Sequence, residues 1–220
     1  MKKLLVTIDG PAGSGKTTVS RRLAEKLGYA YVDTGSLYRG VAFEAGQKGI
    51  APDDDAALEN LCAHIRLRVV KTDAGTRLYS GDTDLSDKIR VPEISMLASA
   101  VSARPVVRRA LLEVQRQLGA EKSAVFEGRD MGTVVFPDAD IKFFLTADLY
   151  TRAMRRYREL LQEAGQTLED VAADMKKRDE NDASRDVAPL KPAADAVTID
   201  STNLSVDEVV AEMMGWVASV

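Results

Sequence analysis

The sequence predicts an α/β fold in which helices wrap a parallel β-sheet. Five short apolar segments have the length and composition of buried strands, and they lie at residues 4–8, 29–32, 124–126, 141–145 and 197–199. Longer segments with helical periodicity separate them, as expected for parallel strands joined by helical crossovers. With 220 residues the chain is long enough for one sizeable core, and we expect one domain over residues 1–220.

The first predicted strand leads into a glycine-rich segment that fits the pattern G-x-x-x-x-G-K-[ST]. Helical spacing of Val19, Leu23 and Leu27 begins directly after it, so the segment lies at a strand-to-helix turn. There the backbone N–H groups and the helix dipole favour a polyphosphate, the lysine reaches its outer phosphates, and a threonine hydroxyl can ligate Mg²⁺. We therefore expect a P-loop that binds ATP or GTP, formed by Gly10, Pro11, Ala12, Gly13, Ser14, Gly15, Lys16, Thr17 and Thr18.

The pattern of parallel strands is interrupted between residues 66 and 85. Residues 66–70 and 76–80 alternate between apolar and polar side chains on either side of a turn at 73–75. We therefore expect a small antiparallel insert, reaching from about residue 62 to about residue 102.

A second helical block is predicted for residues 148–163 and from 167 to about 178. It carries four arginines on a face that packing does not obviously need: Arg152, Arg155, Arg156 and Arg158. With the polar stretch that follows, it forms a predicted helical lid over about residues 152–186. The closing helix is marked by a capping box of Ser205 and Glu208.

Composition narrows the classes of partner. The net charge is −4 and the pI is near 5.2, which disfavours a broad nucleic-acid surface and favours a small molecule. The single Cys62 cannot form an internal disulfide, and with His64 it is too little for a metal cluster. The apolar run near residue 4 is too short for a signal peptide or a membrane span. We expect a cytoplasmic monomer without membrane or nucleic-acid partners.

The segment at residues 33–39 begins where the second predicted strand ends, which is the edge at which open α/β sheets bind ligands. Thr34, Tyr38 and Arg39 are therefore candidates for binding the polar groups of an acceptor. The same segment also fits a purely structural role, in which Asp33 caps the next helix.

Two further polar segments follow the same logic. Residues 127–137 come after the third predicted strand, and the pair Arg129-Asp130, flanked by glycines, is poor core material. In residues 178–185, Arg178, Asp182 and Arg185 recur at helical spacing, a pattern that a solvated helix end also explains.

Taken together, these segments resemble the bacterial cytidylate kinases, the P-loop nucleoside monophosphate kinases specific for CMP and dCMP. The resemblance runs along essentially the whole chain, and the P-loop alone would not be specific. Its most specific part is the sequence Gly128-Arg129-Asp130-Met131-Gly132-Thr133-Val134-Val135-Phe136-Pro137-Asp138-Ala139. It also includes residues 33–39, 178–185, 188–190 and 200–202, and position 127 is Glu where some members carry Asp. The resemblance implies a P-loop NTPase-type sheet with an enlarged nucleotide-binding insert.

The resemblance also implies a role for each candidate. The residues that would contact the CMP phosphate are Arg39, Arg129 and Arg185. Those that would read the cytosine edge are Ser99, Arg108 and Asp130. Those that would hold the ribose are Tyr38, Arg178 and Asp182. The lid arginines that would close over the ATP phosphates are Arg155 and Arg156.

The implied reaction, a step of pyrimidine nucleotide metabolism, transfers the terminal phosphoryl group of ATP to CMP or dCMP with Mg²⁺. A CMP phosphate oxygen is already anionic at neutral pH, so no strong general base is needed. Catalysis would rest on positioning and on charge from Lys16, Arg129 and Arg185. Thr17 would ligate the metal and Asp33 would hold a metal-bound water.

Two alternatives remain open at this point. One is another small-molecule P-loop kinase, acting on UMP or a different acceptor. The other is a P-loop regulatory NTPase, which is disfavoured as a GTP switch because the sequence has no Asn-Lys-x-Asp segment. The acidic residue before the P-loop, Asp9, is either a second metal contact or merely structural.

Overall fold

The computed structural model describes residues 2–72, 75–160 and 167–220. The chain divides into two compact units. The first unit comprises residues 1–30 and 122–220, and the second comprises residues 31–121. The expected single domain, with its boundaries for insert and lid, stays a prediction.

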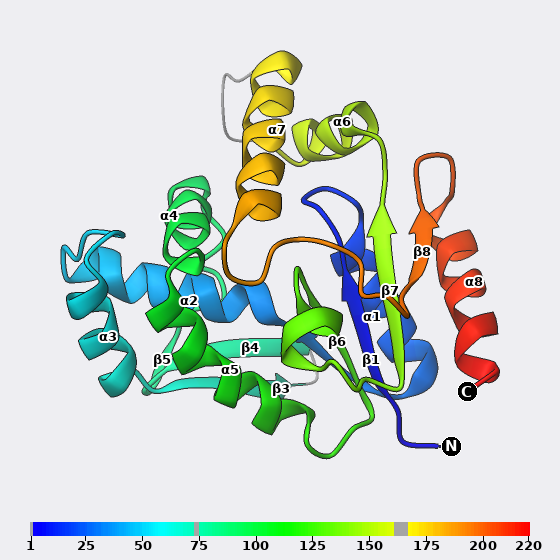
Figure 1. Ribbon diagram of the computed structural model, residues 1–220, viewed down its shortest axis with the longest axis horizontal. Helices are drawn as coiled ribbons and strands as arrows, with labels where there is room; N and C mark the ends of the chain where they lie inside the picture. The colour runs from blue at the N-terminus through cyan, green and yellow to red at the C-terminus, as the bar shows by residue number, and fades with distance from the viewer. Residues whose placement is uncertain (1, 73–74, 161–166) are drawn as a thin grey trace. The chain divides into compact units, whose positions relative to one another are not determined.

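The large sheet confirms the predicted fold class. Its strands are listed in chain order as β1 (Leu5–Asp9), β2 (Ala30–Asp33), β6 (Ala124–Gly128), β7 (Ile141–Thr146) and β8 (Val197–Asp200). They are arranged in the order β2-β6-β1-β7-β8, and β1 runs parallel to both of its neighbours. β7 and β8 are likewise parallel (Figure 1). Each predicted apolar segment thus became a strand, with ends shifted by one or two residues.

Strand β1 shows why the apolar runs predicted the strands of the large sheet. All five of its residues are buried, as expected for a central strand of a parallel sheet. Helix α1 (Lys16–Leu27) follows it and packs against β6 and α8 (Val206–Ala218). The predicted capping box of α8 is confirmed, because Ser205 accepts from the N–H of Glu208 and the Glu208 carboxylate accepts from the N–H of Ser205.

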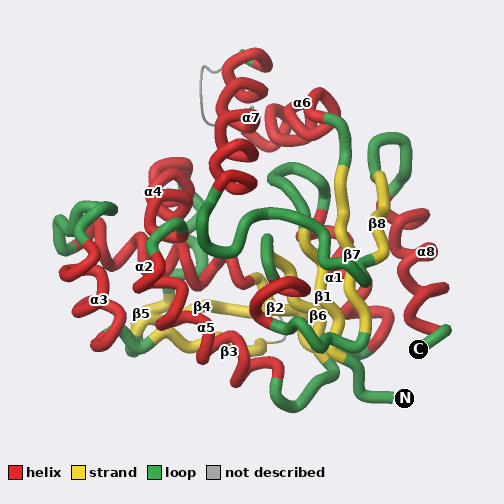
Figure 2. The backbone as a smooth tube through the Cα atoms, viewed as in Figure 1, coloured by secondary structure: helices red, strands yellow, loops and turns green. Residues whose placement is uncertain are grey.

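Helices α6 (Leu149–Leu160) and α7 (Leu168–Ser184) pack against each other through Ala153, Val171 and Met175 (Figure 2). The end predicted for α7 near residue 178 is wrong, because the helix continues to Ser184. The extra turns are polar, and one of them carries Asp182 into a buried position. Residues 161–163 of the other predicted helix lie outside the described residues.

The second unit contains the predicted antiparallel insert. Strands β3 (Leu67–Thr72), β4 (Gly75–Ser80) and β5 (Thr83–Asp84) form an antiparallel sheet, while part of the predicted turn at 73–75 lies outside the described residues. The helices of this unit are α2 (Thr34–Gln47), α3 (Asp55–His64), α4 (Pro92–Ser102) and α5 (Pro105–Gly119). Their shared core includes Leu37, Val41, Leu58, Leu78 and Leu111.

No helix in the described part of the chain is both long enough and apolar enough to cross a bilayer.

Candidate active site

The P-loop lies where the sequence predicts, between β1 and α1. Gly10 has a φ of 149°, and a Cβ there would come within 2.0 Å of the carbonyl oxygen of Leu145. Gly15, with a φ of 88°, precedes the first helical residue, and no described side chain caps α1. A helix terminus whose amides are not capped by a side chain is the arrangement that binds phosphate.

Lys16 is the buried cation of this loop. Its Nζ donates to the carbonyl oxygen of Pro11 at 2.6 Å and to the Ser14 hydroxyl at 3.3 Å. Burial, followed by the positive charge of Arg129, lowers the pKa of Lys16 well below its usual value, whereas Glu127 and Asp9 oppose this shift. A lysine crowded by other cations in a dry site suits a polyanionic ligand.

Glu127 is a residue that the sequence reading left without a role. Its carboxylate accepts from the hydroxyl of Thr17 at 2.8 Å, and it is buried near the end of β6. In the register of the sheet it lies opposite Ile8 of β1, so it reaches the P-loop from the neighbouring strand. An acidic residue directly after a predicted buried strand was the sequence signal that could have found it.

The neighbourhood of Thr17 offers oxygen atoms, which Mg²⁺ prefers. Asp33 instead belongs to the second unit, where its carboxylate accepts from Ser36 N at 3.2 Å and from Arg39 at 2.5 Å. Within the described residues, no group of three or more His, Cys, Asp and Glu side chains is arranged to hold a metal by itself. A Mg²⁺ at Thr17 would therefore take most of its ligands from a bound nucleotide and water, as is usual for this ion.

Three predicted acceptor residues of the first unit meet around one carboxylate. Arg129 donates from Nε to Asp182 at 3.0 Å. Arg185 lies 3.6 Å from the other carboxylate oxygen and donates from Nε to the Asp182 backbone carbonyl at 3.3 Å. Asp182 is buried. Arg178 is close enough to Lys16 to lower the pKa of Lys16. The structure thus gathers two guanidinium groups on one carboxylate, and guanidinium groups are suited to bidentate binding of a phosphate.

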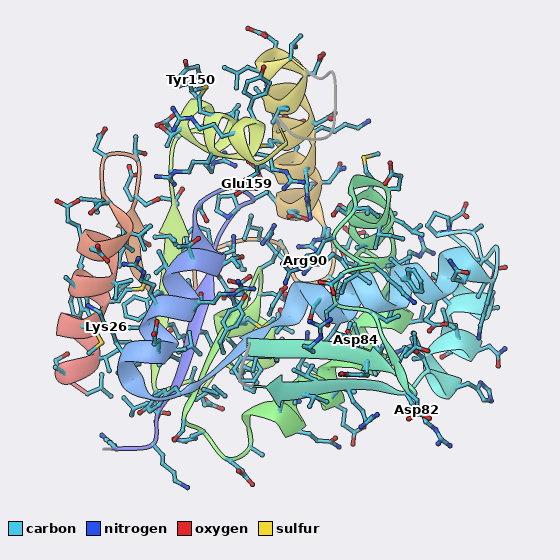
Figure 3. The ribbon with its side chains drawn as sticks, turned by 180° about the vertical axis from the view of Figure 1, so that it is seen from behind. Lys26, Asp82, Asp84, Arg90, Tyr150 and Glu159 are labelled. Carbon is cyan, nitrogen blue, oxygen red and sulfur yellow. The ribbon has the colours of Figure 1, made fainter. Side chains whose placement is uncertain are left out.

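The predicted lid arginines differ in their contacts. Arg155 donates to the hydroxyl and the carbonyl oxygen of Ser201 at 3.1 Å and 2.7 Å, and the Ser201 hydroxyl donates to the carbonyl oxygen of Ser14 in the P-loop. Arg156 pairs instead with Glu159, one turn further along α6 (Figure 3). Arg155 is therefore connected to the P-loop through one residue, whereas Arg156 is engaged along its own helix.

Arg152 contacts the P-loop directly, although no site role was predicted for it. Its guanidinium donates to the carbonyl oxygens of Ala147 and Ala12 at 2.9 Å and 3.1 Å, and to Asp179 at 2.6 Å. It is buried, and these hydrogen bonds connect α6 to α7 and to the P-loop.

Asp130 of the first unit is buried at the N-cap of the turn Met131–Val135, and the second unit holds the other predicted residues. Arg108 is buried, its guanidinium lies 5.5 Å from the ring centroid of Tyr38, and it donates to the carbonyl oxygen of Ser102 at 3.0 Å. Ser99 is on α4, where its carbonyl oxygen accepts from the Ser102 hydroxyl. Thr34 is buried at the start of α2. This unit thus brings Tyr38 and Arg108 together as a cation–π pair.

The strand–loop–helix arrangement and the parallel sheet define the P-loop kinase class of fold. Shikimate kinase from Acinetobacter baumannii superposes with a TM-score of 0.51 at 17% identity, over 99% of this chain and 94% of that chain. An uncharacterised protein from Eubacterium ventriosum gives a TM-score of 0.54 at 16% identity over the full length of both chains. Similarity at these identities concerns the fold alone.

Sequence comparison is more specific. The family model for cytidylate kinase matches residues 6–219, so this chain belongs to the cytidylate kinase family. The cytidylate kinase of Geobacter sulfurreducens is 49% identical over 211 residues, which cover 96% of this chain and 91% of that protein. The cytidylate kinase of Halalkalibacterium halodurans is 42% identical over 218 residues, covering 99% and 98%.

Proposed function

We propose that this chain transfers the terminal phosphoryl group of ATP to CMP or dCMP, giving CDP or dCDP in pyrimidine nucleotide metabolism. Family membership supports the reaction, and the observation that carries it in the structure is the group of arginines near the buried Lys16. Lys16 lies in the P-loop with Arg129 and Arg178 near enough to lower its pKa, and Arg129 shares Asp182 with Arg185. This cluster can neutralise charge on the two phosphate groups between which a phosphoryl group moves.

On the donor side, we assign the triphosphate to residues 10–18, with Arg155 and Arg156 completing the set. Bound Mg²⁺ would neutralise phosphate charge and help to orient the phosphoryl group. Thr17 is our candidate ligand, Glu127 accepts from its hydroxyl, and Asp33 remains our candidate for holding a metal-bound water. Omitting Mg²⁺ should abolish turnover, and adding it back should restore turnover.

On the acceptor side, the first unit contributes Arg129, Asp130, Arg178, Asp182 and Arg185, and the second contributes Thr34, Tyr38, Arg39, Ser99 and Arg108. A CMP phosphate oxygen is the nucleophile and is already anionic, so these residues bind and orient it rather than remove a proton. The buried carboxylate of Asp130 suits the donor N4 amino group of cytosine and opposes the O4 acceptor of uracil. We further expect a cytoplasmic monomer that does not bind nucleic acid.

A panel of nucleoside monophosphates with product identification tests the proposal. CMP and dCMP should be good acceptors, UMP poor, and AMP and GMP nearly inactive. Equal turnover of AMP and CMP would reject the assignment of the acceptor. ATP hydrolysis that is unaffected by any monophosphate would favour a regulatory NTPase instead.

A further inference from the structure

Asp9 is a buried carboxylate to which the reaction assigns no role. It is the last residue of β1, directly before the P-loop, and only 3% of it is exposed. Its two carboxylate oxygens accept separate backbone hydrogen bonds, from Met131 N at 2.9 Å and from Gly132 N at 2.8 Å. Both of its oxygens are therefore committed to a segment more than 120 residues away in the chain.

The two donors belong to the short π-helical turn Met131–Val135, which directly follows Arg129 and Asp130. Asp130 occupies the N-cap position of this turn, but its side chain makes no capping hydrogen bond. Asp9 satisfies the first amides in its place. The carboxylate of Asp130 is thus not used to start the turn on which it sits.

The backbone at Gly132 has little room to move. A Cβ at this position would lie 3.1 Å from the hydroxyl of Thr7 and 3.2 Å from Cδ of Lys142, so the turn is packed closely against β1 and β7. In such a buried place, an amide that loses its acceptor has no water to replace it. The position of the turn therefore depends on a carboxylate at residue 9.

We propose that Asp9 is a positioning residue for the acceptor side of the reaction: by holding the amides of Met131 and Gly132, it sets the backbone from which Arg129 and Asp130 reach the acceptor nucleotide. This inference rests on the assignment of those two residues to the acceptor under the proposed function. It makes Asp9 part of acceptor recognition, although it is adjacent in sequence to the donor-binding loop.

Asp9→Asn is the informative substitution. An asparagine of the same size accepts from one of the two amides, but its own N–H₂ group opposes the other. We expect kcat/KM for CMP to fall at least about tenfold and the preference for CMP over UMP to weaken. Calorimetric affinity for ATP should fall by less than the affinity for CMP. The glycine backbone is unchanged, although the substitution removes one of the two carboxylates that oppose the lowered pKa of Lys16.

Asp140→Asn is the matched control. Asp140 accepts from the backbone N–H of Leu5 at 2.7 Å, so it anchors the other end of the same strand. Its substitution should change thermal stability without changing either kcat/KM for CMP or the CMP-to-UMP ratio. Similar acceptor defects in both variants would show that any weakening of β1 is sufficient, and this would overturn the proposal.

Two other results would also overturn it. One is a folded Asp9→Asn protein with unchanged CMP kinetics, and the other is equal loss of ATP and CMP affinity, which would place Asp9 in the P-loop. If Asp9→Asn does not fold, Asp9→Glu keeps the charge and both acceptor oxygens but displaces the turn by one methylene. It should show the same selective CMP defect, and normal CMP kinetics would reject the proposal.

The monophosphate panel on the unmodified protein tests the proposed function separately. If another acceptor is preferred, the same comparison is made with that acceptor.

Discussion

The two units hold their phosphate-assigned arginines in different ways. In the first unit, Arg129 and Arg185 share the carboxylate of Asp182, of which only 8% of the side chain is exposed. In the second unit, Arg39 forms an ion pair with Asp33, and a quarter of each side chain is exposed. The difference lies in the carboxylate: Asp182 is buried and pairs with two arginines, of which Arg129 is 23% exposed, whereas Asp33 is as accessible to water as Arg39. The arginine–aspartate pairs of the two units are therefore expected to contribute differently to the free energy of unfolding.

The largest effect on turnover is expected from substitution of Lys16, the buried cation of the P-loop. Lys16→Ala should lower kcat at least about 100-fold, because deletion of a single donor to a transition-state charge elsewhere costs roughly 3 kcal/mol. Lys26→Ala is the matched control, since Lys26 is exposed in the last turn of the same helix (Figure 3). Steady-state kinetics with thermal unfolding of both variants checks this. A folded Lys16→Ala protein that retains most of its kcat would mean that Lys16 does not act on the transferred phosphoryl group.

A second prediction compares the two carboxylates directly. Asp182→Asn should lower the free energy of unfolding by about 3 kcal/mol, because it leaves two arginines near an uncharged buried group. Asp33→Asn should lower it by less than about 1 kcal/mol, because asparagine is an equally good helix N-cap and water reaches Arg39. Urea unfolding of the two variants gives both values. Equal losses would show that burial does not distinguish the two sites.

The sequence predicted those parts of the molecule whose signal is local. The strands were readable because a central parallel strand such as β1 is apolar throughout, and the P-loop because its spacing fits one mechanism. The capping box of α8 and the hairpin of the insert also depend on neighbours a few residues apart. The family resemblance, which family membership confirms, supplied the acceptor roles that local patterns leave open.

Side-chain partners distant in the chain could not be predicted in this way. The hydrogen bond from Thr17 to Glu127 joins residues 110 positions apart, and that from Arg152 to Ala12 joins residues 140 apart. Nothing in the spacing of residues 178–185 shows that Asp182 turns inward to bind Arg129. The continuation of α7 to Ser184 follows from the same contact, because tertiary partners stabilise polar turns that periodicity alone would end earlier.

The smallest effect concerns Arg108 of the second unit, which contacts an aromatic ring. Arg108 lies over the ring of Tyr38 at 5.5 Å, and both residues are buried. A cation–π contact of this kind contributes about 0.5–2 kcal/mol, so losing the ring should lower the ratio of kcat/KM for CMP over UMP by about twofold to thirtyfold. Tyr38→Leu removes the ring, whereas Tyr38→Phe keeps it and removes only the hydroxyl. The ratio should therefore fall in the leucine variant and hold in the phenylalanine variant, even if both lose some absolute rate through the ribose contact assigned to Tyr38. Equal ratios in the two variants would show that the aromatic face of Tyr38 does not orient Arg108, and this prediction would then be wrong.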